Sequence, residues 1–138
     1  MDTSALIALK NESETKHSVA MGGFENLLSK NIGIMTTNFV FAETYTLLRY
    51  RVGHKVAVEF GDFVRQSRVI QYVRASEEIE NIAWKIAVKY QGKDFSFADC
   101  VSFALMEKFG INEAFAFDQH FEQFGFELYP KLWGCASA

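Results

Sequence analysis

Short apolar runs alternate with longer amphipathic stretches along this chain, and this alternation limits the folds that it can adopt. Four apolar runs have the length of buried strands: residues 32–35, 69–73, 114–117 and 126–129. Between them, apolar residues recur at the spacing of one helix face. The clearest stripes are Ala20, Phe24, Leu27 and Leu28; Val56, Phe60, Phe63 and Val64; and Ile79, Ile82, Ala83, Ile86 and Tyr90. Short strands alternating with helices predict an α/β fold, with a parallel sheet covered by helices on both faces.

Capping residues mark where several of these helices begin. Thr37 or Asn38 can cap one helix, and Ser76 and Ser96 precede two others. No repeat, low-complexity tract or Pro/Ser-rich linker interrupts the pattern, and 138 residues is an ordinary length for one domain. We therefore expect a single domain over residues 1–138.

The composition excludes several classes of protein. No apolar run approaches the roughly 20 residues that a membrane-spanning helix needs, and the first residues lack the pattern of a secretory signal. We expect a cytoplasmic protein without membrane association. Cys100 and Cys135 have neither a CxxC neighbour nor a partner at zinc spacing, so both are expected to be free thiols.

Carboxylates stand where this architecture gathers its functional groups. The carboxyl ends of parallel strands meet at one edge of the sheet, close to helix N-termini. Asp118 directly follows a predicted strand, Asp2 precedes the first helical pattern, and Asp99 lies in the first turn of a helix. Glu43 shares the apolar stripe of its own helix, so its side chain should point toward the sheet. All four carboxylates could converge.

Four carboxylates held together away from water repel one another unless a cation or a proton compensates. Oxygen ligands alone favour Mg²⁺ or Mn²⁺, as one ion or two. Each residue also has a purely structural explanation. Asp2 and Asp99 could cap helices, Asp118 could be a turn residue, and Glu43 could pair with an arginine. All four coincidences together are less expected than any one of them.

Other chemistries lack their sequence patterns. A haloacid-dehalogenase-type phosphatase needs a second Asp two residues after the first, where this chain has Ser4. No GxGxxG follows a predicted strand and no GxxxxGK[ST] occurs, which argues against dinucleotide-binding folds and P-loop NTPases. His17, His54 and His120 are too dispersed to indicate a histidine-rich metal site. We expect His120 to cap a helix or lie at the surface, because side chains two residues apart diverge from one another at a helix start.

The residues around these carboxylates resemble the PIN domain, particularly the VapC-like ribonuclease toxins of toxin–antitoxin pairs. The resemblance covers nearly the whole chain. Four stretches carry it: residues 2–9 (DTSALIAL), 37–43 (TNFVFAE), 95–106 (FSFADCVSFALM) and 116–121 (AFDQHF). The resemblance implies a three-layer α/β fold, in which helices flank a central parallel sheet of about five short strands.

The resemblance further implies a metal-dependent endoribonuclease that hydrolyses RNA phosphodiester bonds with Mg²⁺ or Mn²⁺. Asp2, Glu43 and Asp99 match the acidic triad of the family, and Asp118 matches a fourth, more variable acidic position. Ser96 matches a hydroxyl position beside the cluster that could orient a water. A cognate antitoxin protein and a second copy in a homodimer are the implied protein partners.

This chain departs from the family pattern at its start. Members usually have several apolar residues before the first Asp, and these form the central strand of the sheet. Here only Met1 precedes Asp2, so we expect the first strand to be truncated. The departure leaves an alternative function open, in which the fold is kept as a catalytically weak or inactive module that binds RNA or protein.

Positive charge is concentrated in residues 49–74, although the whole chain carries a net charge of −3. This segment has six Lys or Arg against two acids, so its balance is 6 − 2 = +4. Such a segment could contact the phosphates of an RNA backbone. A solvated helix face explains the same charges. The candidate RNA-binding residues are Arg49, Arg51, Lys55, Arg65 and Arg68.

Overall fold

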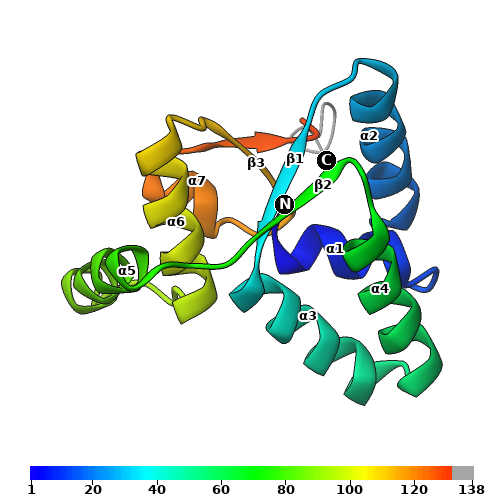
Figure 1. Ribbon diagram of the computed structural model, residues 1–138, viewed down its shortest axis with the longest axis horizontal. Helices are drawn as coiled ribbons and strands as arrows, with labels where there is room; N and C mark the ends of the chain where they lie inside the picture. Colours follow the sequence, from blue (N-terminus) through cyan, green and yellow to red (C-terminus); the bar gives the residue numbers. More distant parts are fainter. Residues whose placement is uncertain (132–138) are drawn as a thin grey trace.

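The computed structural model describes residues 1–131, and within them helices and short strands alternate as the sequence predicts (Figure 1). The helices are α1 (Thr3–Lys10), α2 (His17–Ser29), α3 (Asn38–Arg51), α4 (His54–Gln66), α5 (Glu77–Lys89), α6 (Phe97–Phe109) and α7 (His120–Phe124). The strands are β1 (Ile34–Thr37), β2 (Ile70–Val73), β3 (Glu113–Phe115) and β4 (Glu127–Tyr129). The α/β class is confirmed. Cys135 lies outside the described residues, and Cys100 is a buried free thiol, as expected.

The strands form two separate parallel pairs. In one pair β1 lies beside β2, with Ile34 opposite Ile70. In the other, β3 lies beside β4, with Glu113 opposite Glu127. The expected single sheet of about five strands is not confirmed, since residues 1–131 contain these two pairs in its place.

The first two residues bridge the gap between the two pairs. The amino group of Met1 donates a hydrogen bond to the Met35 carbonyl of β1 at 2.6 Å. The backbone N–H of Asp2 donates to the Phe115 carbonyl of β3 at 2.9 Å. Consecutive residues of a central strand bond to opposite neighbours in this way. The start of the chain therefore occupies the position of a central strand, but over two residues only.

Met1 and Asp2 lie at the boundary between the two strand pairs, which we call the seam. Two hydrophobic clusters lie on either side of this seam. The first is built mainly from α1 to α4 with β1 and β2, and its buried side chains include Leu6, Leu48 and Phe60. The second is built mainly from α5, α6, α7 and β3, and it is rich in phenylalanine. Phe103 stacks on Phe124 with 4.3 Å between ring centroids. The candidate carboxylates come from both sides of the seam.

The predicted capping residues begin the helices that position the site. The Thr37 hydroxyl accepts from the Val40 N–H, and Ser96 caps α6. Asn38 has another role, since its side-chain oxygen accepts from Ala75 N at 2.9 Å and ties α3 to the segment after β2. No helix within residues 1–131 is long and apolar enough to cross a membrane.

Candidate functional site

Asp2 is buried at the seam and fixed by bonds from two directions. It is 2% exposed, and its side chain caps α1. Its Oδ2 accepts from the Ser4 hydroxyl at 3.0 Å, and that hydroxyl in turn accepts from the Phe117 N–H at 3.0 Å. Ser4 therefore ties the Asp2 carboxylate to Phe117, two residues after β3. The sequence analysis did not assign Ser4 this role, although its place two residues after an N-cap Asp is a usual position for such a bond.

Asp99 is held by a reciprocal cap at the start of α6. The Ser96 hydroxyl accepts from the Asp99 N–H, and Asp99 Oδ2 accepts from the Ser96 N–H, both at 3.0 Å. Asp99 is 3% exposed. The cap expected from the sequence is therefore present, and it fixes one carboxylate oxygen. The role of Ser96 in orienting a water stays a prediction.

His120 contacts Asp99, which the sequence analysis did not expect. Asp118 Oδ1 accepts from the His120 N–H at 3.1 Å, and this turn brings the imidazole back over α6. Its Nδ1 lies 2.8 Å from Asp99 Oδ2, and because a carboxylate only accepts, the ring N–H donates. The ring of Phe95 packs against the imidazole at 5.7 Å. The expectation of a surface or capping histidine overlooked that a turn, not a helix, separates His120 from Asp118.

These residues form a compact group of donor atoms. One donor atom from each of Asp99, Asp118 and His120 lies within 4.8 Å of the others. Burial, together with the charge of Asp118, raises the pKa of Asp2 to about 6. Burial also raises the pKa of Asp99, with a further contribution from the charge of Asp2. Three carboxylates therefore meet at this point and destabilise one another's charged forms.

Glu43 lies at the margin of this group. The buried stripe of α3 runs through Val40, Thr44 and Leu48, so Glu43 falls beside that stripe and is half-buried. The sequence analysis expected it to face the sheet as part of the apolar stripe of its helix. Neither Glu43 nor Asp2 supplies an atom to the group within 4.8 Å, but the charge of Asp2 interacts with Asp118 and Asp99. The role of Glu43 stays a prediction.

The five basic candidate residues are exposed and dispersed. They occupy the end of α3, both ends of α4 and the segment before β2: Arg49, Arg51, Lys55, Arg65 and Arg68. Arg51 lines a depression of about 260 Å³ that also reaches Asp118. The five basic residues, although close in sequence, therefore do not form one continuous basic surface.

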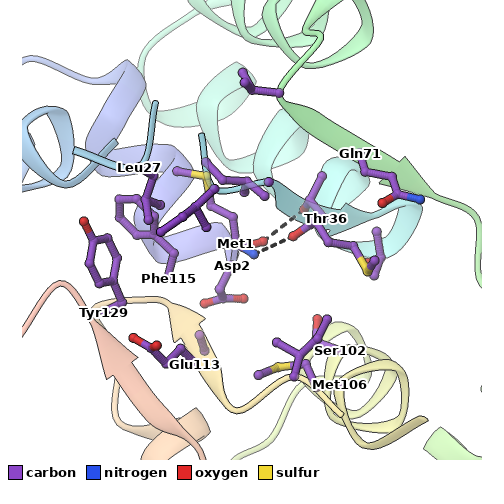
Figure 2. A pocket seen from close by; sticks show the side chains of 18 of the residues that line it. Met1, Asp2, Leu27, Thr36, Gln71, Ser102, Met106, Glu113, Phe115 and Tyr129 are labelled. Carbon is purple, nitrogen blue, oxygen red and sulfur yellow. Dashed lines mark hydrogen bonds between the residues drawn. The ribbon is translucent and has the colours of Figure 1, made fainter. Parts of the chain in front are cut away.

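A larger cavity, of about 780 Å³, lies at the seam between the two strand pairs. Figure 2 shows Met1 and Asp2 at its centre, with Thr36 on one side and Phe115 on the other. The Thr36 hydroxyl donates to the Met1 carbonyl at 3.0 Å. Much of its wall is apolar, including Leu27 and Met106. The cavity lies beside Met1, next to the first residues of β1 and β3. The upstream part of a strand between β1 and β3 would lie in this place.

The donor set fits a divalent cation. Asp2 Oδ1 is fully buried and has no hydrogen-bond partner in the described part of the chain. A buried, unpaired carboxylate oxygen is costly unless a proton or a cation compensates for it. Oxygen donors from Asp2, Asp99 and Asp118, with an imidazole beside them, suit Mg²⁺ or Mn²⁺.

Comparison with known proteins gives one consistent result. The PIN domain family model matches residues 1–127. The 23S rRNA-specific endonuclease VapC20 of Mycobacterium tuberculosis, in strains CDC 1551 / Oshkosh and H37Rv, is 38% identical over 132 residues, covering 95% of this chain and 98% of the relative. The crystal structure of M. tuberculosis VapC20, described as a sarcin-ricin loop cleaving toxin, matches with a TM-score of 0.81 and 36% identity. That match covers 91% of this chain and 93% of the other.

Proposed function

This chain belongs to the PIN-domain family, and from that premise we propose that it is a metal-dependent endoribonuclease, the toxin of a toxin–antitoxin pair. The observation that carries the proposal is the close group of Asp99, Asp118 and His120, beside which lies Asp2 with one oxygen buried and unpaired and with its charge interacting with both other carboxylates. Its substrate class is structured ribosomal RNA, because the relatives that match along nearly their whole length are named for cleavage of 23S rRNA.

Asp2, Asp99 and Asp118 would hold Mg²⁺ or Mn²⁺, as one ion or two. A bound divalent ion supplies a lowered pKa for the attacking water and neutralises the charge that grows on the phosphate. The chain's own groups fix the ligands. Ser4 holds Asp2 Oδ2, and the Ser96 N–H and His120 ring hold Asp99 Oδ2. Each carboxylate thereby keeps its other oxygen for the ion.

Two further residues complete this assignment. Glu43 would accept a hydrogen bond from a water in the site, or bind an ion directly, after a change of side-chain conformation on α3. Ser96 keeps a hydroxyl proton after it accepts from the Asp99 N–H, so it can still donate to a water. Both roles rest on the match to the family pattern.

The finer architecture of the sheet belongs to this proposal as well. Apolar residues ahead of Asp2 would form a central strand and join the two pairs into one sheet of about five strands. This follows because the amino group of Met1 faces β1 and the backbone N–H of Asp2 faces β3. In that register the next amide upstream would face the Glu113 carbonyl of β3. The cavity of about 780 Å³ has the position that such residues need.

The remaining proposals concern partners and location. An antitoxin protein and a homodimer are expected from the family, as is a cytoplasmic location. The five candidate RNA contacts stay candidates: Arg49, Arg51, Lys55, Arg65 and Arg68. A catalytically weak or inactive RNA- or protein-binding module is the alternative to the nuclease, and metal binding separates the two.

The test is cleavage of a ribosomal stem-loop RNA that carries the sarcin–ricin loop, beside the same stem with a scrambled loop. We expect site-specific cleavage with Mg²⁺ or Mn²⁺ and none with EDTA. Mn²⁺ binding is followed separately by electron paramagnetic resonance of the free ion. Bound Mn²⁺ should also raise the melting temperature, by mass action. A chain that neither binds Mn²⁺ nor cleaves would be the inactive module.

A further inference from the structure

Asp2, Asp99 and Asp118 together form the acidic group of the site. A depression of about 260 Å³ runs from this group along one side of α1. Asp118, Ser4, Ala8, Lys16 and Arg51 are among the residues that line it. The Phe117 N–H, next to Asp118, donates to the Ser4 hydroxyl, whereas the ring of His17, next to Lys16, is hydrogen-bonded to the Ala8 carbonyl at 2.8 Å. Ser4 and Ala8 are four residues apart on α1, or about 6 Å at 1.5 Å per residue. The depression therefore extends about one helical turn beyond the metal ligands.

The two cations in this depression are available for a ligand. Lys16 is half-buried at the start of α2, and Arg51 is exposed at the end of α3. Neither forms an ion pair within residues 1–131, where the ion pairs are Lys108 with Glu78 and His120 with Asp99. The two cations come from segments far apart in the sequence, and the fold brings them to one wall.

The charge of the depression depends on the acidic group. Lys16 and Arg51 face two acids there, Glu14 and Asp118. An ion held by Asp118 offsets that carboxylate, which leaves the depression with a net positive charge. A guanidinium offers paired N–H groups that match two phosphate oxygens, and an ammonium adds a point charge. An anion of phosphate geometry fits this end of the depression.

We propose that Lys16 and Arg51 form a phosphate subsite, which holds the RNA backbone beside the bond that is cleaved. The inference rests on the proposed nuclease function and deepens it. A phosphate held at Lys16 is not the one at Asp118 but a near neighbour in the same strand, because Lys16 lies at the Ala8 end of the depression and Asp118 at the Ser4 end. The subsite fixes the path of the strand across α1 and contributes to binding, not to the chemical step.

Arg51→Ala and Lys16→Ala test the subsite against Lys89→Ala and Lys30→Ala. Lys89 occupies the last turn of α5 as Arg51 does that of α3, and Lys30 stands at the other end of α2 from Lys16. Neither control residue lines the depression. We expect each test variant to raise KM for the stem-loop RNA about tenfold, as a lost charge-assisted bond does. The kcat, the cleavage position and Mn²⁺ affinity should not change.

The salt dependence supplies a second readout. Each test substitution should reduce the slope of log(kcat/KM) against log[salt] by about 0.7, and the double variant by about 1.4. Arg51→Lys should restore the slope but not the full KM, because the charge returns without the paired N–H groups.

Two results would overturn the subsite. Test variants that match the controls in KM and slope would show that Lys16 and Arg51 are ordinary surface residues. A fall in Mn²⁺ affinity that parallels the loss of kcat/KM would show that they act through the metal site. Either result leaves wild-type cleavage intact, whereas a wild-type protein that fails to cleave RNA overturns the proposed function and the subsite with it.

Discussion

The acidic group of Asp2, Asp99 and Asp118, here called the acidic centre, and the basic segment of residues 49–74 are both dense in charge, but they differ in burial. Asp2 and Asp99 are buried, and backbone and side-chain groups fix both carboxylates. Arg49, Lys55 and Arg65 point into solvent from two helices. Burying a carboxylate costs free energy that a surface arginine does not cost. Two carboxylates buried beside a half-buried third therefore support the proposed ligand site, whereas charge that is dense only along the sequence gives no such support.

The largest expected effect comes from the acidic centre. Asp99→Asn should reduce RNA cleavage on the order of 10³-fold or more, because loss of a ligand charge removes several kcal/mol of transition-state stabilisation. The amide keeps the shape and an acceptor oxygen for the Ser96 N–H, so the melting temperature should barely move. Asp94→Asn, at an exposed position in the same segment, is the matched control. Cleavage that survives in both variants would refute the assignment of Asp99.

Glu43→Gln tests how far the acidic centre extends. Glu43 stands at the margin of the donor group, so we expect a smaller loss of cleavage, about 10- to 100-fold, as for residues that orient a ligand or a water. Mn²⁺ affinity should fall less than in Asp99→Asn. The measurement is kcat beside Mn²⁺ titration. Wild-type values for both would remove Glu43 from the site and leave three carboxylates.

An inserted strand should strengthen the acidic centre without touching its residues. Val-Ile-Val inserted after Met1 would enter the cavity at the seam and tether Asp2, which now follows a single residue. Asp2 is already held by its bonds to Ser4 and Phe115, so Mn²⁺ should bind only about twofold to threefold more tightly, less than the about 1 to 2 kcal/mol that ordering a free residue would contribute. The melting temperature should rise by roughly 5 °C. Ser-Gly-Ser is the control insertion of equal length. If both insertions behave alike, the cavity does not select an apolar strand.

The smallest expected effect is a dependence of apoprotein stability on pH, which has two limbs of opposite sign. The pKa of Asp2 rises on folding from 3.8 to about 6, so the fold loses stability as pH increases across that interval. Burial lowers the pKa of the Met1 amino group from 8.0 to about 6, so the fold gains stability from there to pH 8. The free energy of unfolding should therefore pass through a minimum near pH 6.

Denaturant titration of the metal-free protein from pH 4 to pH 8 measures this curve. Added Mn²⁺ should remove the falling limb, because the cation takes the place of the proton on Asp2. Acetylation of the amino group should remove the rising limb only. A curve that stays flat in the metal-free protein would contradict a shared, buried carboxylate group.

The sequence predicted the elements and the buried acids better than their assembly. Each of the four apolar runs overlaps a strand, because short apolar runs with helix-breaking residues on both sides have few alternatives. Asp99 was correctly placed in a capping box, since that motif is local. The division of the strands into two pairs was not predictable, because it depends on which distant strand each edge meets.

The positions of the Glu43 and His120 side chains also depended on tertiary packing that the sequence pattern does not reveal. The stripe of α3 could pass through Leu47 or Leu48, and only packing decided for Leu48, which moved Glu43 to the margin. His120 meets Asp99 through a turn whose conformation is set by one hydrogen bond to Asp118. Residue spacing fixes directions within a regular element, but not across a turn.

The seam between the two hydrophobic clusters also has a mechanical consequence. Asp2 is fixed to the first cluster through α1, whereas Asp99 and Asp118 belong to α6 and to the turn after β3 in the second. An ion bound by all three would connect the two hydrophobic clusters, which otherwise share few main-chain hydrogen bonds at the seam. Loading the site should therefore stiffen the molecule as a whole, and amide protons of β1 and β3 should exchange more slowly than those on the outer face of α5.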